Sequence, residues 1–530
     1  MSKDVMTLLD YGAGNVRSVI NAITRLGCEV KVVACAADIG SAERLICPGV
    51  GEFGAMMTAL NAQGYTEPLR EYLRSGRPYL GICLGLQVLF EGSEEAPGVP
   101  GLGVIAGQVR RFQTSLSVPM IGWNGIRAKQ ASPLLRGLRG DEKLYFVHSY
   151  HVVPDDPSEI LTTTDYDGEF VSSVQRGALV ATQFHPEKSG EIGLRIFGNF
   201  VGADVCDTTE LPPTRPRTGL AKRVIACLDV RSNDAGDLVV TKGDQYDVRE
   251  AGEVRNLGQP VELARRYYEE GADEIIFLNI TGFREFPLKD MPMLEVLRKT
   301  SESVFVPLTI GGGIRAFTDS EGRNYDALDV AHEYFRSGAD KISIGSDAVY
   351  IVEQYLREGR KTGSSSIERI AKTYGSQAVV ISVDPRRVYV QSPDEVHHRC
   401  IETEIPGPEG QTTCWYQCTV RGGREGRDLD AISFVRACEA LGAGEILLNC
   451  IDRDGTNAGF DIELIRAVQA AVTIPVIASS GAGCAEHFFE VFDQTDVEAA
   501  LAAGIFHRRE VPISAVKTHL STRCVEIRNT

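Results

Sequence analysis

Short apolar runs alternate with longer amphipathic stretches along most of the chain. In its first part, the runs VMTLLD, EVKVV, RLICPGVG and YLGIC are separated by stretches such as SVINAITRLG and LGLQVLFEG. Short apolar runs are typical of buried strands, and apolar positions spaced by three or four residues are typical of helices. The alternation predicts β–α–β units and a mostly parallel sheet.

From residue 221 onward the pattern repeats itself, with four apolar strands in each half. The first half contains VIACLDV, GADEIIFLNIT, VPLTIGGGI and GADKISIGSDAV, and the second contains VVISVDP, GAGEILLNCID, IPVIASSGAG and VEAALAAGIFH. In both halves an Asp ends the first strand and a Gly-rich turn ends the third. Eight such units predict a (β/α)8 TIM barrel built from two half-barrel repeats.

The segment TTELPPTRPRTGL at 208–220 divides the two regions, because it contains three prolines and lacks apolar periodicity. We therefore predict an α/β domain over 1–205, a Pro-rich linker over 206–220 and the barrel over 221–530. The barrel region exceeds the usual length of about 250 residues. Polar inserts near 231–255, 316–326, 357–366 and 391–412 account for the excess.

Composition excludes several classes of function. A net charge of −17 argues against a broad nucleic-acid surface. No apolar stretch is long enough to span a membrane, and the first residues lack the pattern of a secretory or transit segment, so we expect a cytoplasmic enzyme. The 13 cysteines are scattered, which is untypical of a disulfide framework. Cys414 and Cys418 lack a second pair at metal-ligand spacing, so no metal site is expected.

A candidate nucleophile, Cys83, lies in the motif GICLGLQ, between a predicted strand and a helix that starts near Leu84. This arrangement is a nucleophile elbow with Cys in place of Ser, and a helix N-terminus favours the reactive thiolate. His185 and Glu187, in ATQFHPEKSG, would lie on the same side of an extended segment, as general base and orienting carboxylate. The Gly-rich turn CPGVGEF at 47–53 offers N–H donors for an oxyanion.

An isolated Cys is more often a buried apolar residue, but the elbow, the HPE motif and the PGVG turn together favour catalysis. GICLGLQ, TQFHPEKSG and PGVGEF resemble the class I (triad) glutamine amidotransferases, and VPMIGWN and YFVHSYH resemble the histidine-pathway branch of that class. The resemblance implies that Gln87 lines the glutamine pocket and that Gly49, Val50 and Gly51 lie near the oxyanion. His148 is a weaker candidate for a second base, since His185 already fills that role.

Active sites of barrels lie at the carboxyl ends of the strands. Asp229 and Asp384 end the first and fifth strands, and Asp452 and Asp454 follow the sixth. A lone Asp after a strand is more often a cap or turn former, but the symmetric recurrence favours general acid–base work by Asp229 and Asp384. The Gly-rich turns TIGGGI and ASSGAG stand at equivalent places and predict a substrate with a phosphate at each end.

The second region resembles the cyclase of imidazole glycerol phosphate synthases, and the fused order is similar to the fungal and plant bifunctional form. The resemblance implies glutamine and a bis-phosphorylated ribonucleotide as substrates, phosphoribulosyl-formimino-aminoimidazole carboxamide ribonucleotide, which ammonia converts into imidazole glycerol phosphate and aminoimidazole carboxamide ribonucleotide. It further implies no cofactor and no separate subunit, so a monomer is expected. The residues implied are the acid–base pair Asp229 and Asp384, substrate contacts at Lys242 and Asp454, and phosphate anchors at Gly313, Gly345, Ser346, Ser480, Gly481 and Gly504.

Two positions depart from the family pattern. Ser480 stands where Gly is commoner in the bacterial cyclases, and we expect phosphate binding to survive because a hydroxyl can donate to phosphate. Asn279 stands where Asp is frequent, so no acid–base role is assigned to it.

Ammonia made in one domain needs a protected route to the other, and the barrel axis offers one. Arg223, Glu274, Lys341 and Glu445 each precede an apolar strand run and match the gate positions of the family. A salt-bridge ring that stabilises the bottom of the barrel is the alternative, and both interpretations are compatible.

Three other functions are compatible with part of the sequence. A glutaminase fused to a pyridoxal phosphate synthase would need a Schiff-base lysine at the mouth, where this chain has Asp. A half-barrel sugar isomerase also uses two aspartates but needs no amidotransferase. A regulatory phosphate binder with a silent amidotransferase domain would not need the intact set of Cys83, His185 and Glu187.

Overall fold

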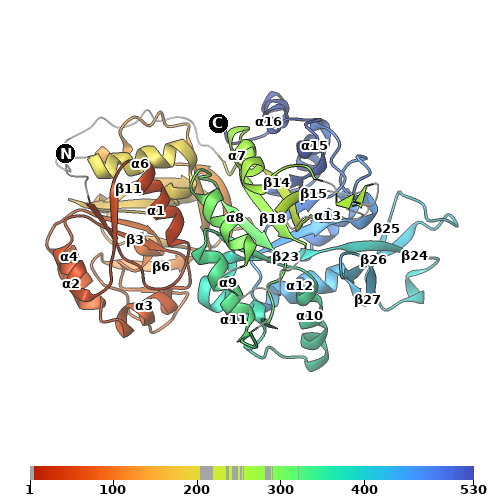
Figure 1. The fold of residues 1–530 in the computed structure, drawn as a ribbon, viewed down its shortest axis with the longest axis horizontal. Helices are drawn as coiled ribbons and strands as arrows, with labels where there is room; N and C mark the ends of the chain where they lie inside the picture. The colour runs from red at the N-terminus through yellow and green to blue at the C-terminus, as the bar shows by residue number, and fades with distance from the viewer. Residues whose placement is uncertain are drawn as a thin grey trace.

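The computed structural model describes residues 5–202, 219–233, 238–241, 249–250, 253–254, 256–280, 288, 291–319 and 321–529. The chain forms two lobes side by side, the first coloured red to yellow and the second green to blue in Figure 1. Most of the predicted linker, 206–218, lies outside the described residues, and so does Lys242.

An eleven-stranded sheet forms the centre of the first lobe, with the order β2-β1-β3-β4-β13-β12-β10-β6-β5 and with β11 and β8 attached beside β12. Its strands are β1 (Val5–Leu8), β2 (Glu29–Val32), β3 (Leu45–Gly49), β4 (Tyr79–Cys83), β5 (Gly92–Ser93), β6 (Gly107–Arg111), β8 (Arg127–Ala128), β10 (Tyr150–Pro154), β11 (Ile160–Asp165), β12 (Glu169–Arg176) and β13 (Leu179–Thr182). The helices are α1 (Val16–Arg25), α2 (Ala36–Ser41), α3 (Phe53–Ala62), α4 (Thr66–Arg74), α5 (Leu84–Gln87) and α6 (Gly190–Gly202), with 3-10 turns at Pro133–Leu135, Pro157–Glu159 and Pro186–Lys188.

The prediction of a mostly parallel sheet is correct for only part of this lobe. Strands β2, β1, β3, β4 and β13 are parallel, whereas β12 pairs antiparallel with β13, β10 and β11. The apolar runs that supported the prediction all precede residue 90. From β11 to β13 the strands follow one another with turns too short for a crossover connection, so β12 pairs antiparallel with both β11 and β13.

The second lobe is a closed barrel of eight parallel strands in chain order, since β14 pairs with both β18 and β30. The strands are β14 (Arg223–Ser232), β18 (Glu274–Asn279), β19 (Leu308–Gly311), β22 (Lys341–Ile344), β23 (Val379–Val383), β28 (Glu445–Asn449), β29 (Val476–Ser479) and β30 (Ala499–Ala502). The helices are α7 (Pro260–Glu269), α8 (Pro292–Ser301), α9 (Ala327–Arg336), α10 (Ser346–Glu358), α11 (Ser366–Tyr374), α12 (Ala431–Leu441), α13 (Ile462–Gln469), α14 (Ala485–Gln494), α15 (Gly504–His507) and α16 (Ile513–Thr522). The predicted (β/α)8 architecture is confirmed.

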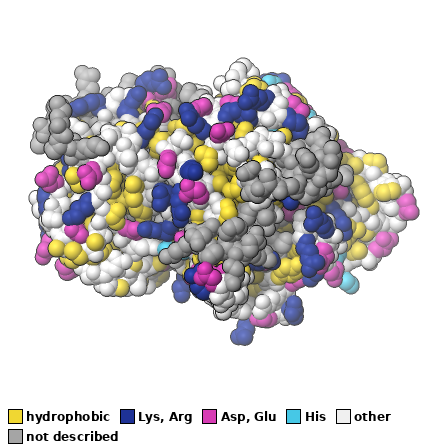
Figure 2. Space-filling view, in the orientation of Figure 1, with side chains coloured by type: hydrophobic (Ala, Val, Ile, Leu, Met, Phe, Trp, Pro, Cys, Tyr) yellow, Lys and Arg dark blue, Asp and Glu magenta, His cyan; other side chains and the backbone are white. Residues whose placement is uncertain are grey.

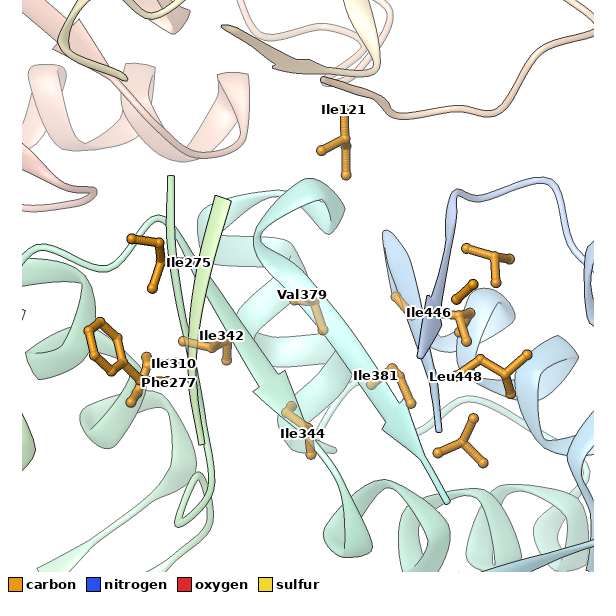
Figure 3. Close-up of a cluster of buried hydrophobic side chains, with 14 of the residues drawn as sticks. Ile121, Ile275, Phe277, Ile310, Ile342, Ile344, Val379, Ile381, Ile446 and Leu448 are labelled. Atoms are coloured by element: carbon orange, nitrogen blue, oxygen red, sulfur yellow. The ribbon is translucent and has the colours of Figure 1, made fainter. Parts of the chain in front are cut away.

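Side chains along the barrel strands point alternately into the barrel and toward the surrounding helices, and they form two separate apolar cores. Side chains such as Ile276, Val380 and Leu447 form a small cluster inside the barrel. Their neighbours, including Ile275, Ile342 and others labelled in Figure 3, pack outward in the large cluster between strands and helices. Successive residues of a strand point to opposite faces, so one apolar run supplies both cores.

Short strands outside the barrel wall form hairpins and one small sheet. A four-stranded sheet, within which the predicted insert 391–412 falls, extends beyond the barrel at the right of Figure 1. Its strands are β24 (Pro385–Val390), β25 (Cys400–Glu402), β26 (Thr413–Val420) and β27 (Glu425–Asp430). The other strands are β15 (Leu238–Thr241), which pairs with β14, β16 (Arg249–Glu250), β17 (Glu253–Val254), β20 (Phe317–Thr318) and β21 (Asn324–Tyr325), with 3-10 turns at Ser376–Ala378, Pro393–Glu395 and Ile451–Arg453.

A two-stranded ribbon, β7 (Met120–Gly125) with β9 (Lys143–His148), joins the lobes. Trp123 donates its indole N–H to the carbonyl of Asp273, 3.1 Å away, and belongs to the same core cluster as the barrel strands. Ile121 of this ribbon lies over the barrel core in Figure 3. The first lobe therefore contacts the amino-terminal ends of the barrel strands, opposite the mouth.

None of the described helices is long and apolar enough to cross a membrane. On the face shown in Figure 2, acidic and basic side chains are interspersed.

Candidate functional site

Cys83 lies at a strained turn between β4 and α5. Its φ of 53° and ψ of −104° are rare for a residue with a side chain, as a nucleophile elbow requires. Gly85 permits the turn, because a Cβ there would lie 2.0 Å from the carbonyl oxygen of Cys47. The predicted elbow is present, but α5 spans only four residues, so the helix behind the thiol is shorter than the sequence indicated.

His185 and Glu187 are held together beside Cys83. The Nδ1 of His185 donates to Oε1 of Glu187 at 2.7 Å, and both residues are buried. The contact is made through the 3-10 turn Pro186–Lys188, and not through the extended i, i+2 alternation that was predicted. Burial opposes the charged imidazole, but Glu187 and Cys83 outweigh it and raise the pKa of His185 well above its ordinary value.

The Gly-rich turn after β3 lies against the elbow. Gly49 pairs with Cys83 in the parallel ladder, and a Cβ on Gly49 would lie 2.4 Å from the Cβ of Leu84. The Tyr11 hydroxyl donates to the carbonyl of Val50 at 2.7 Å, which fixes that peptide beside the thiol. The following residue, Gly51, has a φ of 148°. These residues place backbone groups where the sequence predicted an oxyanion site.

Gln87 points to the same region through a chain of hydrogen bonds. Its Nε2 donates to Oε1 of Gln183 at 3.1 Å, and Nε2 of Gln183 donates to Sγ of Cys83 at 3.4 Å. Gln183 was not selected from the sequence. Its place two residues before His185 in the ATQFHPE motif was the available signal.

Glu95 is a second residue that the sequence reasoning missed. Its carboxylate accepts the Phe53 N–H at 2.9 Å, and burial, together with the nearby Glu52, raises its pKa to about 7. It interacts electrostatically with Tyr150, whose carbonyl accepts from Gln87. A half-buried carboxylate in this region is suited to bind an ammonium group.

His148 has a structural role in this arrangement. Its Nδ1 donates to the Tyr150 carbonyl at 2.7 Å, and its ring lies among Phe112, Phe146 and Phe170. Burial lowers the pKa of His148 to about 3, so it remains neutral. This environment supports the preference for His185 as the base.

A small cavity of about 20 Å³ lies between the lobes. Cys83, His185 and Tyr145 line it from the first lobe, and Asp340 and Lys341 line it from the barrel. Its volume is close to the minimum that one water molecule needs. The Cys83 thiol and the bottom of the barrel therefore line one small cavity.

The four predicted gate residues form a closed ring at the bottom of the barrel. Arg223 binds Glu274 at 2.8 Å and Glu445 at 2.5 Å. Lys341 binds the same carboxylates at 2.7 and 2.6 Å. All four side chains are at most 1% exposed, and in the part of the chain that the structure describes each charge is neutralised by its neighbours in the ring and by hydrogen bonds such as the one from Thr309. The ring separates the cavity at Cys83 from the apolar interior of the barrel.

A cavity of about 790 Å³ opens at the other end of the barrel. The predicted residues that line it are Asp229, Asp384, Asp454, Gly313, Gly345, Ser346 and Ser480. Gly481 and Gly504 directly follow the lining residues Ser480 and Ala503. The structure thus brings most of the predicted mouth residues to one space, while Lys242 lies outside the described residues.

Asp384 is oriented by two neighbours that were not predicted. Asn449 Nδ2 donates to its Oδ1 at 2.8 Å, and the Thr419 hydroxyl donates to its backbone carbonyl at 2.6 Å. Asp452, in contrast, accepts the Arg387 N–H at 2.7 Å and thereby anchors the inserted sheet.

Ser480 adopts a φ of 73°, a conformation that glycine reaches without steric cost. This explains in physical terms why glycine suits the position and why serine there stores strain of about 1 kcal/mol. Asn279 lines the same cavity at the end of β18.

No group of three or more His, Cys, Asp or Glu side chains among the described residues is arranged to hold a metal ion. Cys414 and Cys418 are buried within β26.

Comparison with protein-family models assigns the two lobes separately. The class-I glutamine amidotransferase model matches residues 7–202, and the model described as histidine biosynthesis protein matches residues 223–512. With the Cys–His–Glu site and the barrel mouth, these matches define a glutamine amidotransferase fused to a histidine-biosynthesis barrel.

Relatives of known name specify the family. The chain is 58% identical to the chloroplastic imidazole glycerol phosphate synthase hisHF of Arabidopsis thaliana, over 99% of this chain and 90% of the relative. It is 54% identical to the hisHF of Schizosaccharomyces pombe, over 99% and 100%. The HisF subunit of Methanothermobacter thermautotrophicus is 41% identical over 58% of this chain and 99% of its own length. The chain belongs to the family of fused imidazole glycerol phosphate synthases.

Proposed function

We propose that this chain hydrolyses glutamine at Cys83 and uses the ammonia in the barrel to make imidazole glycerol phosphate and aminoimidazole carboxamide ribonucleotide. The observation that carries the proposal is the enclosed cavity lined by both Cys83 and Lys341, because it joins the thiol to the barrel.

In the glutaminase half-reaction, His185 takes the thiol proton and Cys83 attacks the amide carbon of glutamine. The tetrahedral oxyanion is stabilised by backbone N–H groups of the Gly49, Val50 and Gly51 turn. His185 then gives its proton to the leaving nitrogen, ammonia departs, and water hydrolyses the thioester to glutamate. Glu187 stabilises the imidazolium that exists between these steps.

Glutamine is held by Gln87 and Glu95. The Glu95 carboxylate binds the α-ammonium group, whose positive charge stabilises the ionised form of this half-buried side chain. Gln87 and Gln183 bind the side-chain amide through donors and acceptors that already face Cys83.

Ammonia passes from the small cavity through the ring of Arg223, Glu274, Lys341 and Glu445. Beyond the ring the barrel interior is apolar, which favours neutral ammonia over ammonium. A polar ring followed by an apolar passage therefore delivers the unprotonated nucleophile and excludes protonated ammonium. The same ring contributes to the stability of the barrel, so the two roles proposed for it are compatible.

At the mouth, Asp229 and Asp384 exchange protons with the substrate during addition of ammonia and ring closure. One phosphate is bound by Gly313, Gly345 and Ser346. The other is bound by Ser480, Gly481 and Gly504, and further substrate contacts come from Asp454 and Lys242.

Two substitutions test this scheme when glutamine and ammonium salts are supplied in separate assays. Cys83→Ala should abolish glutamine-dependent synthesis and leave ammonium-dependent synthesis intact, whereas Asp384→Asn should abolish both. Glutamine-dependent synthesis that survived Cys83→Ala would contradict the assignment of the nucleophile.

We further propose that the chain acts as a cytoplasmic monomer, because both catalytic lobes are present in one polypeptide. Light scattering coupled to gel filtration measures the mass directly, and a dimer mass would contradict this part of the proposal. The Arabidopsis relative is named chloroplastic, so the compartment needs localisation of the tagged protein.

A further inference from the structure

A tight turn between β26 and β27 brings two arginines to the mouth of the barrel. Arg421, Gly422 and Gly423 have φ values of 56°, 65° and 78°, so three successive residues adopt the left-handed conformation. Arg421, Gly422 and Arg424 line the mouth cavity together with Asp229 and Asp384. The turn belongs to the inserted sheet, and sequence reasoning assigned it no role.

Hydrogen bonds and ion pairs fix this turn to one side of the mouth. The backbone N–H of Arg421 donates to Oγ of Ser346 at 3.1 Å, and Ser346 begins α10. Two turns further along α10, Glu353 accepts two hydrogen bonds from Arg427, both at 2.8 Å. The arginine turn therefore lies beside the Gly345–Ser346 end of α10, where a phosphate site is proposed.

The described residues that line the cavity carry charges of both signs. Four aspartates line it, Asp229, Asp347, Asp384 and Asp454, and a substrate with two phosphates adds several further negative charges. Of the other lining arginines, Arg315 lies 3.7 Å from Asp347, which partly neutralises it. Within the described part of the chain, the Arg421 guanidinium forms an ion pair with Glu425 at 3.4 Å, an exposed interaction of little energy. Its guanidinium can therefore turn to a phosphate at low cost.

We propose that Arg421 and Arg424 bind the substrate phosphate that lies at Gly313, Gly345 and Ser346, and that they set the affinity for the doubly phosphorylated nucleotide. Guanidinium groups bind phosphate oxygens in a bidentate way, which a backbone N–H cradle alone does not provide. The inference rests on the cyclase function proposed above and adds a binding element that the inserted sheet supplies.

The test is the double variant Arg421→Gln/Arg424→Gln, assayed with saturating ammonium salt and varied nucleotide. A charge-assisted hydrogen bond to each guanidinium predicts that KM for the nucleotide rises by roughly 10- to 100-fold. We expect kcat within about threefold of the unmodified protein, because the acid–base pair is untouched. KM should also depend less on ionic strength, since two screened charges are gone.

Arg427→Gln is the matched control, because Arg427 lies on the same hairpin but is held by Glu353 and Glu425. We expect it to lower thermal stability and leave KM for the nucleotide within about twofold. The proposal is overturned if the double variant keeps its KM or if Arg427→Gln raises KM equally. Absence of ammonium-dependent turnover in the unmodified protein would instead contradict the cyclase function itself.

Discussion

The ammonium group of Lys188 in the first lobe lies 2.7 Å from Oδ2 of Asp340 in the barrel. Lys188 directly follows Glu187, and Asp340 directly precedes Lys341 of the charged ring. Lys188 is 1% exposed and Asp340 is 14% exposed. Asp340 also accepts from Asn15 of the first lobe and from the Leu308 N–H of the barrel. One carboxylate therefore links the segment that carries the proposed triad residues His185 and Glu187, the lobe interface and the start of β22.

Lys188→Met should weaken the interface between the lobes. Breaking a buried ion pair while its partner remains costs roughly 3–5 kcal/mol, and the loosened cavity at Cys83 should release ammonia to solvent. We expect a lower urea midpoint and less product per glutamine hydrolysed. Lys129→Met, which breaks a pair of similar length with Glu169 at the surface, is the control and should change little. Equal behaviour of the two variants would contradict the prediction.

Glu274→Ala should uncouple synthesis from glutamine hydrolysis. It leaves Arg223 and Lys341 buried with one carboxylate between them, which costs roughly 3–5 kcal/mol and disturbs the passage. Glutamine turnover should continue while product per glutamine falls, and ammonium-dependent synthesis should be retained.

Thr309→Val is a control for the ring, since it removes only the hydroxyl that donates to Glu274 at 2.6 Å and keeps all four charges. Its product yield per glutamine should match that of the unmodified protein. Unchanged yield in Glu274→Ala would exclude the ring as a gate but would leave the enzyme function standing.

Glu187→Gln should shift the pH profile of glutamine hydrolysis. Glu187 stabilises the imidazolium, so its loss lowers the raised pKa of His185 and moves the acidic limb of kcat/KM, below which the general base is protonated, to lower pH. The rate should fall by roughly 10²- to 10⁴-fold because the ring also loses its orientation. The raised pKa of His185 also stabilises the folded protein, and this contribution decreases as the pH rises. It is fully present below the ordinary histidine pKa near 6.5 and is lost as pH rises through the raised value. An unmoved acidic limb would show that another group controls it.

Glu95→Gln should stabilise the protein without ligand in a pH-dependent manner. The folded pKa of about 7 exceeds the ordinary value of 4.5, so the folded state loses stability as pH rises from 4.5 through 7. The variant lacks this loss and should be more stable at pH 8 by on the order of 1–3 kcal/mol, with a small difference at pH 4.5. Thermal melts across this range measure the effect.

Glu95→Gln should weaken glutamine binding although it stabilises the protein. Because the variant cannot pair with the α-ammonium group, KM for glutamine should rise by roughly 10-fold or more at pH 8. A variant that gained stability but kept its KM would show that Glu95 lies outside the glutamine pocket.

Much of the architecture was predictable because it depends on local periodicity. The duplicated strand order predicted a closed barrel, and the elbow at Cys83 followed from a strand, a sharp turn and flanking glycines. The antiparallel half of the first sheet was not predicted. Its strands, such as β12, bury residues on both faces, and some of these residues are polar. Their pattern therefore does not indicate which neighbouring strand they pair with.

Residues that act through distant partners were also beyond the sequence. Gln183, Glu95 and Asn449 are ordinary polar residues in the chain, and only folding places them against Cys83, Phe53 and Asp384. Arg421 and Arg424 belong to a charged, Gly-containing turn, a pattern that is typical of solvent-exposed turns. The contact that fixes the inserted sheet to α10 is made between residues far apart in the sequence, so the local pattern does not indicate it.

The sequence by itself determined the two folds, the Cys83, His185 and Glu187 set, and the four charged residues at the strand starts, because strand period, turn chemistry and spacing are local properties. Only the tertiary structure decided how these parts meet. It closed Arg223, Glu274, Lys341 and Glu445 into one ring, and it placed Lys188 against Asp340 across the lobes. Such contacts join residues far apart in the chain, and their partners are selected by packing and charge neutralisation in the folded molecule.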